Sequence, residues 1–587
     1  MELWGEPISG DIFTLDLLYG YHKLKPQVNS LCMQEREIGY SNADVVVKLQ
    51  GWDPTHSKSV SQASLSALKQ LIILDKGLPG KKSPYIRLGC RCDWPNINPP
   101  GWDPSSDTGA HPSFSYYKNS KNLRAYQNVT IISCFYEMRN YPWNWPVFGM
   151  LPGVLLRLSR IDDIIWVLEK NNLTFSFKGP WFARMDMLFT VDPANIQHML
   201  SSNFSNYNKG PEFKELIDVF GGSILIADGE LWKNLRMSSQ AILSRQGFQN
   251  MSMSVTTSKL KDVLLPLFSR FSEDGTILDL QEVFQRFMFD TTLVTTIGSD
   301  PQSLSTEMPE LELAKALENA GEAIVFRHFI PRFMWKFQTW MGLGQAKKLI
   351  DAGATFDRVC VKYILAKREE IRSQEIDHHQ DHPDGESEDV LTYFMKLDTS
   401  KYELLKPSDD KFLRDTIVAS ILAMRDTTST ALTWLYPPIP FECTSPIQSD
   451  VLPSGHRIEA NFAIIIPIYL MGRMKSIWGE DALQFKPERW ISETVKLRHE
   501  PSSKFFVFNS GPRICPGKNL AILVMKNVVV EILQNYDIKL VKGHKVKPKP
   551  RLVLQMKHGL RLVVIVEELD GLTLFLSVML DVKGKDD

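Results

Sequence analysis

The chain has 587 residues, a formal net charge of -1 and an apolar fraction of 43%. This composition is typical of a globular protein and excludes a largely disordered chain. The near-zero charge gives no electrostatic reason to expect nucleic acid as a partner. The seven cysteines are scattered and odd in number, which argues against a secreted disulfide framework and favours a reducing compartment.

The first 130 residues are rich in Pro, Gly, Ser and Asn and show no sustained helical or strand period. The tetrapeptide GWDP occurs at Gly51 and again at Gly101, which is too few copies for a repeat array. We therefore expect residues 1–130 to be an unassigned N-terminal extension, poorly ordered and without a packed core. No stretch of the sequence has the roughly 18 continuous apolar residues of a membrane-spanning helix, and the start does not resemble a signal peptide.

Structured elements are predicted from Tyr141 onward, where a proline-rich entry leads into an amphipathic helix. Residues 182–200 predict a strand followed by a helix that begins near Asp192 and Pro193. Several helical patterns fill residues 260–370. The acidic run at 373–389 contains three histidines, which could hold a metal, but a solvated connection between helices is the more common role of such a run.

Trp232 and Arg236 stand four residues apart in the pattern DGELWKNLRMSSQ. On a helix, that spacing places both side chains on one face. An indole N–H beside a guanidinium makes a good pair of donors for a carboxylate. The same spacing also occurs where a Trp simply packs against a surface Arg.

A long helix is predicted over residues 409–434, because no Gly or Pro interrupts it and Ser408 can cap its start. Its middle places an acid next to an alcohol, at Asp426 and Thr427. Such a pair can relay protons to a bound group. Alternatively it is only a polar break in an apolar helix, with Thr427 bonded back to a carbonyl and Asp426 facing solvent.

The decapeptide FNSGPRICPG, at residues 508–517, presents one cysteine, Cys515, just ahead of an apolar helical run. We interpret Cys515 as an iron ligand, since a haem-bound thiolate needs a shielded sulfur held at a fixed position. Gly511 would form a tight turn, and Arg513 carries a permanent planar charge suited to a haem propionate. Phe508 would cover the ring, and Gly517 would let the next helix approach closely. The alternative is an ordinary buried cysteine.

The pattern Phe-x-x-Gly-x-Arg-x-Cys-x-Gly resembles the haem-ligand signature of the cytochrome P-450 family, and the resemblance continues from near Tyr141 to about Val566. It implies a mainly α fold with a small β part, the cytochrome P-450 fold. The haem domain would span residues 131–568, followed by a C-terminal tail over residues 569–587. The apolar helix expected at 518–535 would lie buried in the core.

The resemblance also implies roles for the residues singled out above. Cys515 would be the axial thiolate of haem, and Trp232 with Arg236 would form a second contact to the propionates. Asp426 and Thr427 would relay protons during O2 activation. Electrons would come from NADPH through NADPH-cytochrome P-450 reductase.

One part of the family pattern is missing. A Glu-x-x-Arg helix is expected between the oxygen-activating helix and the haem-ligand loop, but no Glu in that interval has an Arg three residues later. We therefore predict a deletion with its junction at Trp434 and Leu435. It would leave Arg489 without a charge partner, which costs several kcal/mol at a buried site. Met424 also stands where the family has Gly and would crowd the oxygen site.

The sequence is most similar to the plant branch of the cytochrome P-450 family that hydroxylates long aliphatic chains. It implies a monooxygenase that inserts one atom of O2 into a C–H bond of a fatty acid or a wax alkane, on the cytosolic face of the endoplasmic reticulum membrane. Membrane contact is expected although no anchor helix is seen. The alternative is a degenerate, non-catalytic family member with impaired haem binding. A third possibility is an interaction module of residues 1–130 fused to a damaged enzyme.

Overall fold

The computed structural model describes residues 144–153, 161–183, 185–377, 388–434, 440–492, 497–549 and 551–566. All of them belong to one of the two units into which the chain divides, the unit that contains residues 132–587. The predicted extension, the tail, the histidines of the acidic run and Leu435 lie outside the described residues. Within the described part, no helix is both long enough and apolar enough to cross a membrane.

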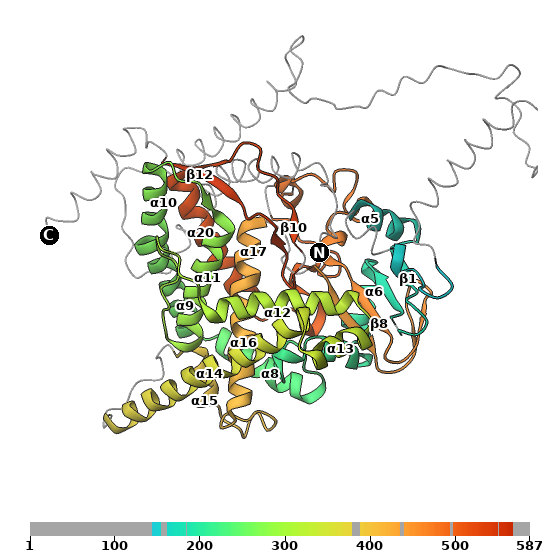
Figure 1. Ribbon diagram of the computed structural model, residues 1–587, viewed down its shortest axis with the longest axis horizontal. Coiled ribbons are helices and arrows are strands. Elements are labelled where there is room, and N and C mark those ends of the chain that lie inside the picture. Colours follow the sequence, from blue (N-terminus) through green and yellow to red (C-terminus); the bar gives the residue numbers. More distant parts are fainter. Residues whose placement is uncertain are drawn as a thin grey trace, which may run out of the picture. The chain divides into compact units, whose positions relative to one another are not determined.

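Helices dominate the described residues, as predicted (Figure 1). The α-helices are α5 (Ile161–Lys170), α6 (Pro193–Gln197), α7 (Pro211–Leu216), α8 (Gly229–Leu243), α9 (Gln246–Lys259), α10 (Leu265–Glu273), α11 (Leu280–Ile297), α12 (Glu312–Phe329), α13 (Arg332–Met341), α14 (Gly344–Asp377), α15 (Val390–Met395), α16 (Asp410–Ile421), α17 (Thr427–Trp434), α18 (Ile468–Met471), α19 (Lys475–Trp478) and α20 (Lys518–Asn535). Short 3-10 and π turns are η1 (His198–Ser202), η2 (Phe204–Asn206), η3 (Asp218–Phe220), η4 (Leu260–Leu264), η5 (Leu422–Asp426), η6 (Pro487–Trp490), η7 (Phe506–Phe508) and η8 (Gly511–Arg513).

The β part is small and divides into four sheets. Its strands are β1 (Thr174–Phe177), β2 (Met187–Thr190), β3 (Tyr207–Asn208), β4 (Leu278–Asp279), β5 (Glu442–Pro446), β6 (Asp450–Val451), β7 (Arg457–Ile458), β8 (Ala463–Ile466), β9 (Tyr536–Leu540), β10 (Pro548–Lys549), β11 (Gln555–Met556) and β12 (Arg561–Val566). The largest sheet has the order β1-β2-β8-β5-β3, and only β2 and β8 run parallel in it. β4, β12 and β9 form a second sheet, and two hairpins complete the set.

Local sequence explains several element boundaries. The predicted strand and helix after residue 182 are observed as β2 and α6, and the Asp192 carboxylate caps α6 by accepting from the Ala194 amide at 2.9 Å. α11 ends at Gly298, whose φ of 74° is the left-handed conformation that favours glycine at a helix C-terminus. Two apolar clusters form the core: one joins the largest sheet to α20, and the other packs α8, α11, α12, α14 and α16 together.

The predicted long helix is present, but it is not regular. It runs as α16, the π-helical turn η5 and α17, covering Asp410–Trp434 without a gap. The predicted cap at Ser408 is wrong: Asp409 caps the helix by accepting from the Lys411 amide at 2.9 Å. A single π turn inside a helix is frequent at functional sites, and this one contains Asp426.

The helix after the haem-ligand loop differs from the prediction. α20 was expected to be buried on nearly every side, yet only Val524, Val528, Ile532 and Leu533 are fully buried. Leu523 is 43% exposed. The other apolar side chains of α20 are half-buried, so the helix is less enclosed by the described residues than its sequence predicts.

Candidate haem site

The decapeptide forms a compact loop that presents Cys515. The Cys515 amide donates to the Phe508 carbonyl at 2.8 Å and closes the loop over the short helices η7 and η8. Gly511 has a φ of 60°, and a side chain there would overlap the carbonyl oxygen of Leu200. The structure thus gives a physical reason for the glycine that the sequence places at this turn.

The thiol of Cys515 is held between burial and positive groups. Burial raises its pKa, while the backbone amides of Gly517 and Lys518 and the charges of Arg236 and Lys518 lower it. The amides belong to the start of α20, where the helix dipole favours a negative sulfur. Burial is the largest effect, so the pKa of Cys515 is raised overall, and the amides and positive charges oppose that rise by favouring the thiolate, which is the form that binds a metal.

The predicted cationic residues converge on this loop. Arg236, on α8, donates to the Ile514 carbonyl beside Cys515. Arg513 forms an ion pair with Asp228 at 2.5 Å, and its guanidinium lies 4.7 Å from the centre of the Trp232 ring. Residues that are almost three hundred positions apart in the chain therefore build one cationic and aromatic wall.

Lys209 belongs to the same wall, and sequence reasoning missed it. It lines the cavity together with Arg236 and Arg513, and its ammonium group contacts the Glu442 carboxylate. Asn509 of the decapeptide donates to the other oxygen of Glu442 at 3.2 Å. A lone Lys before a Gly-Pro pair carries no distinctive spacing, so only the fold reveals its place.

The acid and the alcohol of the long helix face different ways. Thr427 lines the cavity, and its hydroxyl donates to the Ala423 carbonyl at 2.5 Å. Asp426 is buried behind it, and its carboxylate lies 3.2 Å from Arg425. Burial raises the pKa of Asp426. Of the polar-break alternative, the back-bonded Thr427 is observed, but the solvent-facing Asp426 is not.

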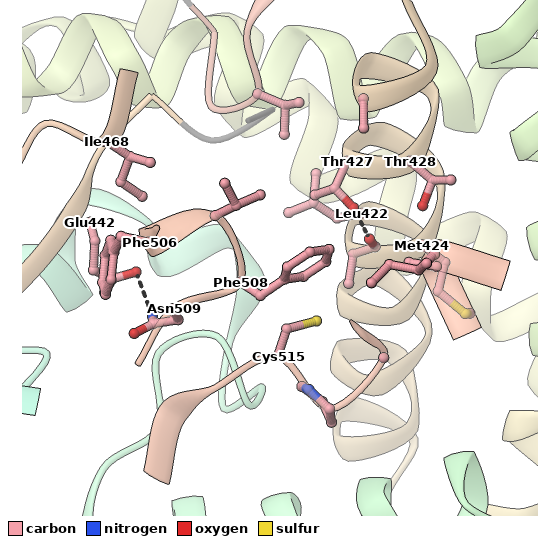
Figure 2. A pocket seen from close by; sticks show the side chains of 18 of the residues that line it. Leu422, Met424, Thr427, Thr428, Glu442, Ile468, Phe506, Phe508, Asn509 and Cys515 are labelled. Carbon is pink, nitrogen blue, oxygen red and sulfur yellow. Dashed lines mark hydrogen bonds between the residues drawn. The ribbon is translucent and has the colours of Figure 1, made fainter. Parts of the chain in front are cut away.

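These side chains enclose a cavity of about 1270 Å³ with mostly apolar walls. Figure 2 shows Phe508 and Cys515 on one side, facing the helix that carries Met424 and Thr427 on the other. Met424 lines the cavity, as expected from its place in the sequence, so its thioether occupies space near Thr427. The cavity also continues past Trp434 to residues 482–487.

Arg489 does have a charge partner, contrary to the prediction. It forms an ion pair with Asp481 at 2.9 Å and donates to the Trp478 carbonyl at 2.7 Å. Trp478, Trp490 and Phe505 stack beside it, with ring centres 4.5 to 6.3 Å apart. The prediction failed because Asp481 lies within the same loop and was not considered as a partner.

The donor set fits a haem group. A buried thiol with backbone amides and positive charges beside it, a cluster of cations and an apolar enclosure are what a thiolate-ligated porphyrin with two propionates requires. Cys515 would bind the iron, and Arg236, Arg513 and Trp232 would face the propionates. The described residues contain no group of three or more His, Cys, Asp and Glu side chains that could hold a bare metal ion instead.

Comparison with known proteins gives the class of protein. The cytochrome P450 family model matches residues 140–435 and again 435–564. The chain therefore belongs to the cytochrome P450 family, a class of haem-thiolate monooxygenases that draw electrons from a reductase.

Individual relatives indicate the branch of the family to which the chain belongs. The chain is 49% identical to alkane hydroxylase MAH1 of Arabidopsis thaliana over 465 residues, covering 72% of this chain and 92% of that protein. It is 35% identical to noroxomaritidine synthase of Narcissus over 481 residues, covering 72% and 91%. Cytochrome P450 86B1 of Arabidopsis thaliana is 32% identical, covering 73% and 86%. The chain thus lies in the plant alkane and fatty acid hydroxylase branch.

Proposed function

We propose that the chain hydroxylates a long-chain aliphatic substrate, either a fatty acid or a wax alkane. The observation that supports this most directly is the cavity, in which Cys515, Thr427 and a mostly apolar wall face the same space. An alkyl chain gains about 25 cal/mol for each Å² of apolar surface that it buries there. The similarity to an alkane hydroxylase supports the same substrate class.

The reaction balances as R–H plus O2, two electrons and two protons giving R–OH and water. The electrons would come from NADPH through NADPH-cytochrome P-450 reductase. When bound, haem supplies the iron centre at which O2 is reduced. Cys515 provides the thiolate, and Phe508, Gly511 and Gly517 shape the loop that holds it.

The proton-handling residues are Thr427 and Asp426. The Thr427 hydroxyl sits on the cavity wall with its own proton given to the Ala423 carbonyl, so its oxygen is free to accept a proton donor in the cavity. Asp426 lies one residue earlier and is shifted toward its protonated form by burial. We infer that Asp426 stores the proton and that Thr427 positions its acceptor.

Turnover tests the proposed activity. The full-length protein, loaded with haem and mixed with reductase and NADPH, is expected to convert hexadecane or palmitate to hydroxylated products. A working enzyme of this kind should make on the order of 1–10 turnovers per second. Gas chromatography with mass spectrometry detects the products. If the protein contained a full complement of haem and oxidised NADPH but formed no product from hexadecane or palmitate, the proposed substrate class would be wrong.

A second proposal concerns the missing segment. The family match stops and restarts at residue 435, next to the proposed junction. The 465 aligned positions with the Arabidopsis relative take in 72% of the 587 residues, about 423, so about 42 of them have no residue in this chain. Trp434 lines the cavity, so a segment following it would start against that space. These observations support a degenerate member with weakened haem binding as the alternative function.

We also propose contact with the cytosolic face of the endoplasmic reticulum membrane. An exposed aromatic patch supports it, formed by Trp145, Phe148, Trp181, Phe182, Phe333, Phe337 and Trp340. Phe182 joins its three segments, because its ring centre lies 6.5 Å from that of Phe148 and 6.1 Å from that of Phe333. A contiguous exposed patch of this kind marks an interaction surface, and Trp favours the membrane interface.

Removing the two most exposed rings tests this surface. Trp181 is 75% exposed and Trp340 is 79% exposed, so their replacement with serine should leave the core intact. We expect the double variant to bind liposomes of endoplasmic reticulum lipid composition at least tenfold more weakly, since burying one large apolar side chain is worth about 1.5–3 kcal/mol. Sedimentation with the liposomes measures the binding. Leu497→Ser, at a 67% exposed site outside the patch, is the control and should bind as the parent does.

A further inference from the structure

A chain of buried charges links the cavity wall to the acid of the long helix. Arg425 lies 3.2 Å from Asp426 and 3.8 Å from Glu318 of α12. The other oxygen of Glu318 lies 3.3 Å from Arg551. The side chains of Arg425, Asp426 and Arg551 are 4%, 12% and 12% exposed, and that of Glu318 is half-buried at 25%. Opposite charges alternate along the whole chain, which is how a buried network avoids an uncompensated ion.

The far end of this chain touches the substrate space. Leu552 and Val553, which follow Arg551 directly, line the cavity. Leu552 also packs within van der Waals distance of the Gly321 position on α12, one turn beyond Glu318. The ion pair between Arg551 and Glu318 therefore fixes this part of the wall to α12.

The near end of the chain acts on Asp426. Beyond burial, which raises the pKa of Asp426, Arg425 and Arg551 lower it and Glu318 raises it. The other helix packed on this turn, α11, presents Phe289 to Arg425, with 5.1 Å between the guanidinium carbon and the ring centre. The charged groups that face Asp426 in the described part are thus Arg425, Glu318 and Arg551.

Arg425 has few other contacts to hold it in place. Its Nε and Nη1 atoms are buried without a hydrogen-bond partner among the described residues. A guanidinium normally satisfies its donors in a fixed fork geometry. Its ion pairs with Asp426 and Glu318 and its contact with the Phe289 ring are consequently what hold this side chain among the described residues.

We propose that Glu318 is a positioning residue that couples the cavity wall at Leu552 and Val553 to Asp426. One of its oxygens anchors Arg551 and hence the wall, and the other lies beside Arg425, where its negative charge adds to the field at Asp426. A substrate that displaces the wall also moves Arg551, and so changes the field at Asp426. The inference concerns the cavity of the proposed function and rests on that function only for the kind of molecule that fills it.

Two charge-neutralising variants are expected to shift the pKa of Asp426 in opposite directions. Both are expected to change hydrogen exchange at the cavity wall in the same direction. Glu318→Gln removes a negative charge and is expected to lower the pKa of Asp426, so that the acid deprotonates at lower pH. Arg551→Gln removes a positive charge and is expected to raise that pKa. Both variants break the anchor, and both should speed amide hydrogen exchange at residues 551–556. General damage to the fold would move the two pKa values in the same direction.

The experiment uses the full-length protein and does not require substrate turnover, so its outcome does not depend on the proposed activity. Infrared titration follows the carboxyl stretch that Asp426→Asn removes, and mass spectrometry follows hydrogen exchange. Glu322→Gln is the matched control, because Glu322 lies one turn away on α12 and pairs with Lys348; it should change neither readout. Arg551→Lys keeps the charge and should titrate as the parent. Shifts of one sign, or no shift in either Gln variant, would overturn the proposal.

Discussion

Replacing Cys515 with serine is expected to abolish haem-thiolate character and activity. Removing a partner outside the ligand set typically costs about 10- to 100-fold in metal affinity or activity, so loss of the ligand itself should exceed about 100-fold. A serine hydroxyl stays protonated at neutral pH and offers no sulfur to the iron. The absorption spectrum of the reduced protein under carbon monoxide measures thiolate ligation, and product formation measures activity.

Cys443 supplies the control for this experiment. Cys443 lines the same cavity and is buried. This burial raises its pKa and so disfavours the thiolate. Cys443→Ser should therefore keep the parent spectrum, with at most a modest loss of stability. If Cys515→Ser kept the thiolate spectrum, or Cys443→Ser lost it, the ligand assignment would be wrong.

Restoring the proposed missing segment should have an equally large effect in the opposite direction. An insertion between Trp434 and Leu435 of the segment that the Arabidopsis alkane hydroxylase has at this point is expected to raise haem occupancy and thermal stability together. The insertion would begin against the cavity and could cover Leu523 of α20, which is 43% exposed. Each large apolar side chain newly buried adds about 1.5–3 kcal/mol.

Two further insertions separate the causes. A glycine- and serine-rich segment of equal length tests chain length alone and should restore nothing. The same segment with the Glu and the Arg of the family's Glu-x-x-Arg pattern replaced by glutamine tests that pattern. Because Arg489 already pairs with Asp481, we expect this version to recover part of the stability through burial alone. Parent protein that purifies with one haem per chain and gains nothing from the insertion would contradict the proposed loss of haem binding.

Local chemistry made the haem loop predictable from sequence. The tasks of Gly511 and Cys515 depend on near neighbours in the chain, so a ten-residue pattern was sufficient. The same holds for the helix start at Asp192 and Pro193, where the cap and the first turn are adjacent residues. Ser408 and Asp409 show the limit, because two adjacent residues can both cap a helix and only the backbone geometry decides between them.

Pairings between distant segments were not predictable. Lys209 meets Glu442 through the pairing of β3 with β5, and nothing in the residues around Lys209 indicates that pairing. Glu318 and Arg551 come together only because α12 lies beside the segment that precedes β11. The prediction for Arg489 was wrong for the opposite reason. Its partner Asp481 is near in sequence, whereas the family pattern predicts a distant partner.

The π turn η5 fixes the rotational phase of the site. An α-helix advances about 100° per residue, and a π turn accommodates one residue more than an α turn does. The π turn therefore absorbs one residue that a regular α-helix could place only by rotating everything after it by about 100°. If the same sequence formed an uninterrupted α-helix, Thr427 would leave the cavity wall, and the buried position of Asp426 would pass to another side chain. The site therefore depends on the π turn as much as on the two side chains.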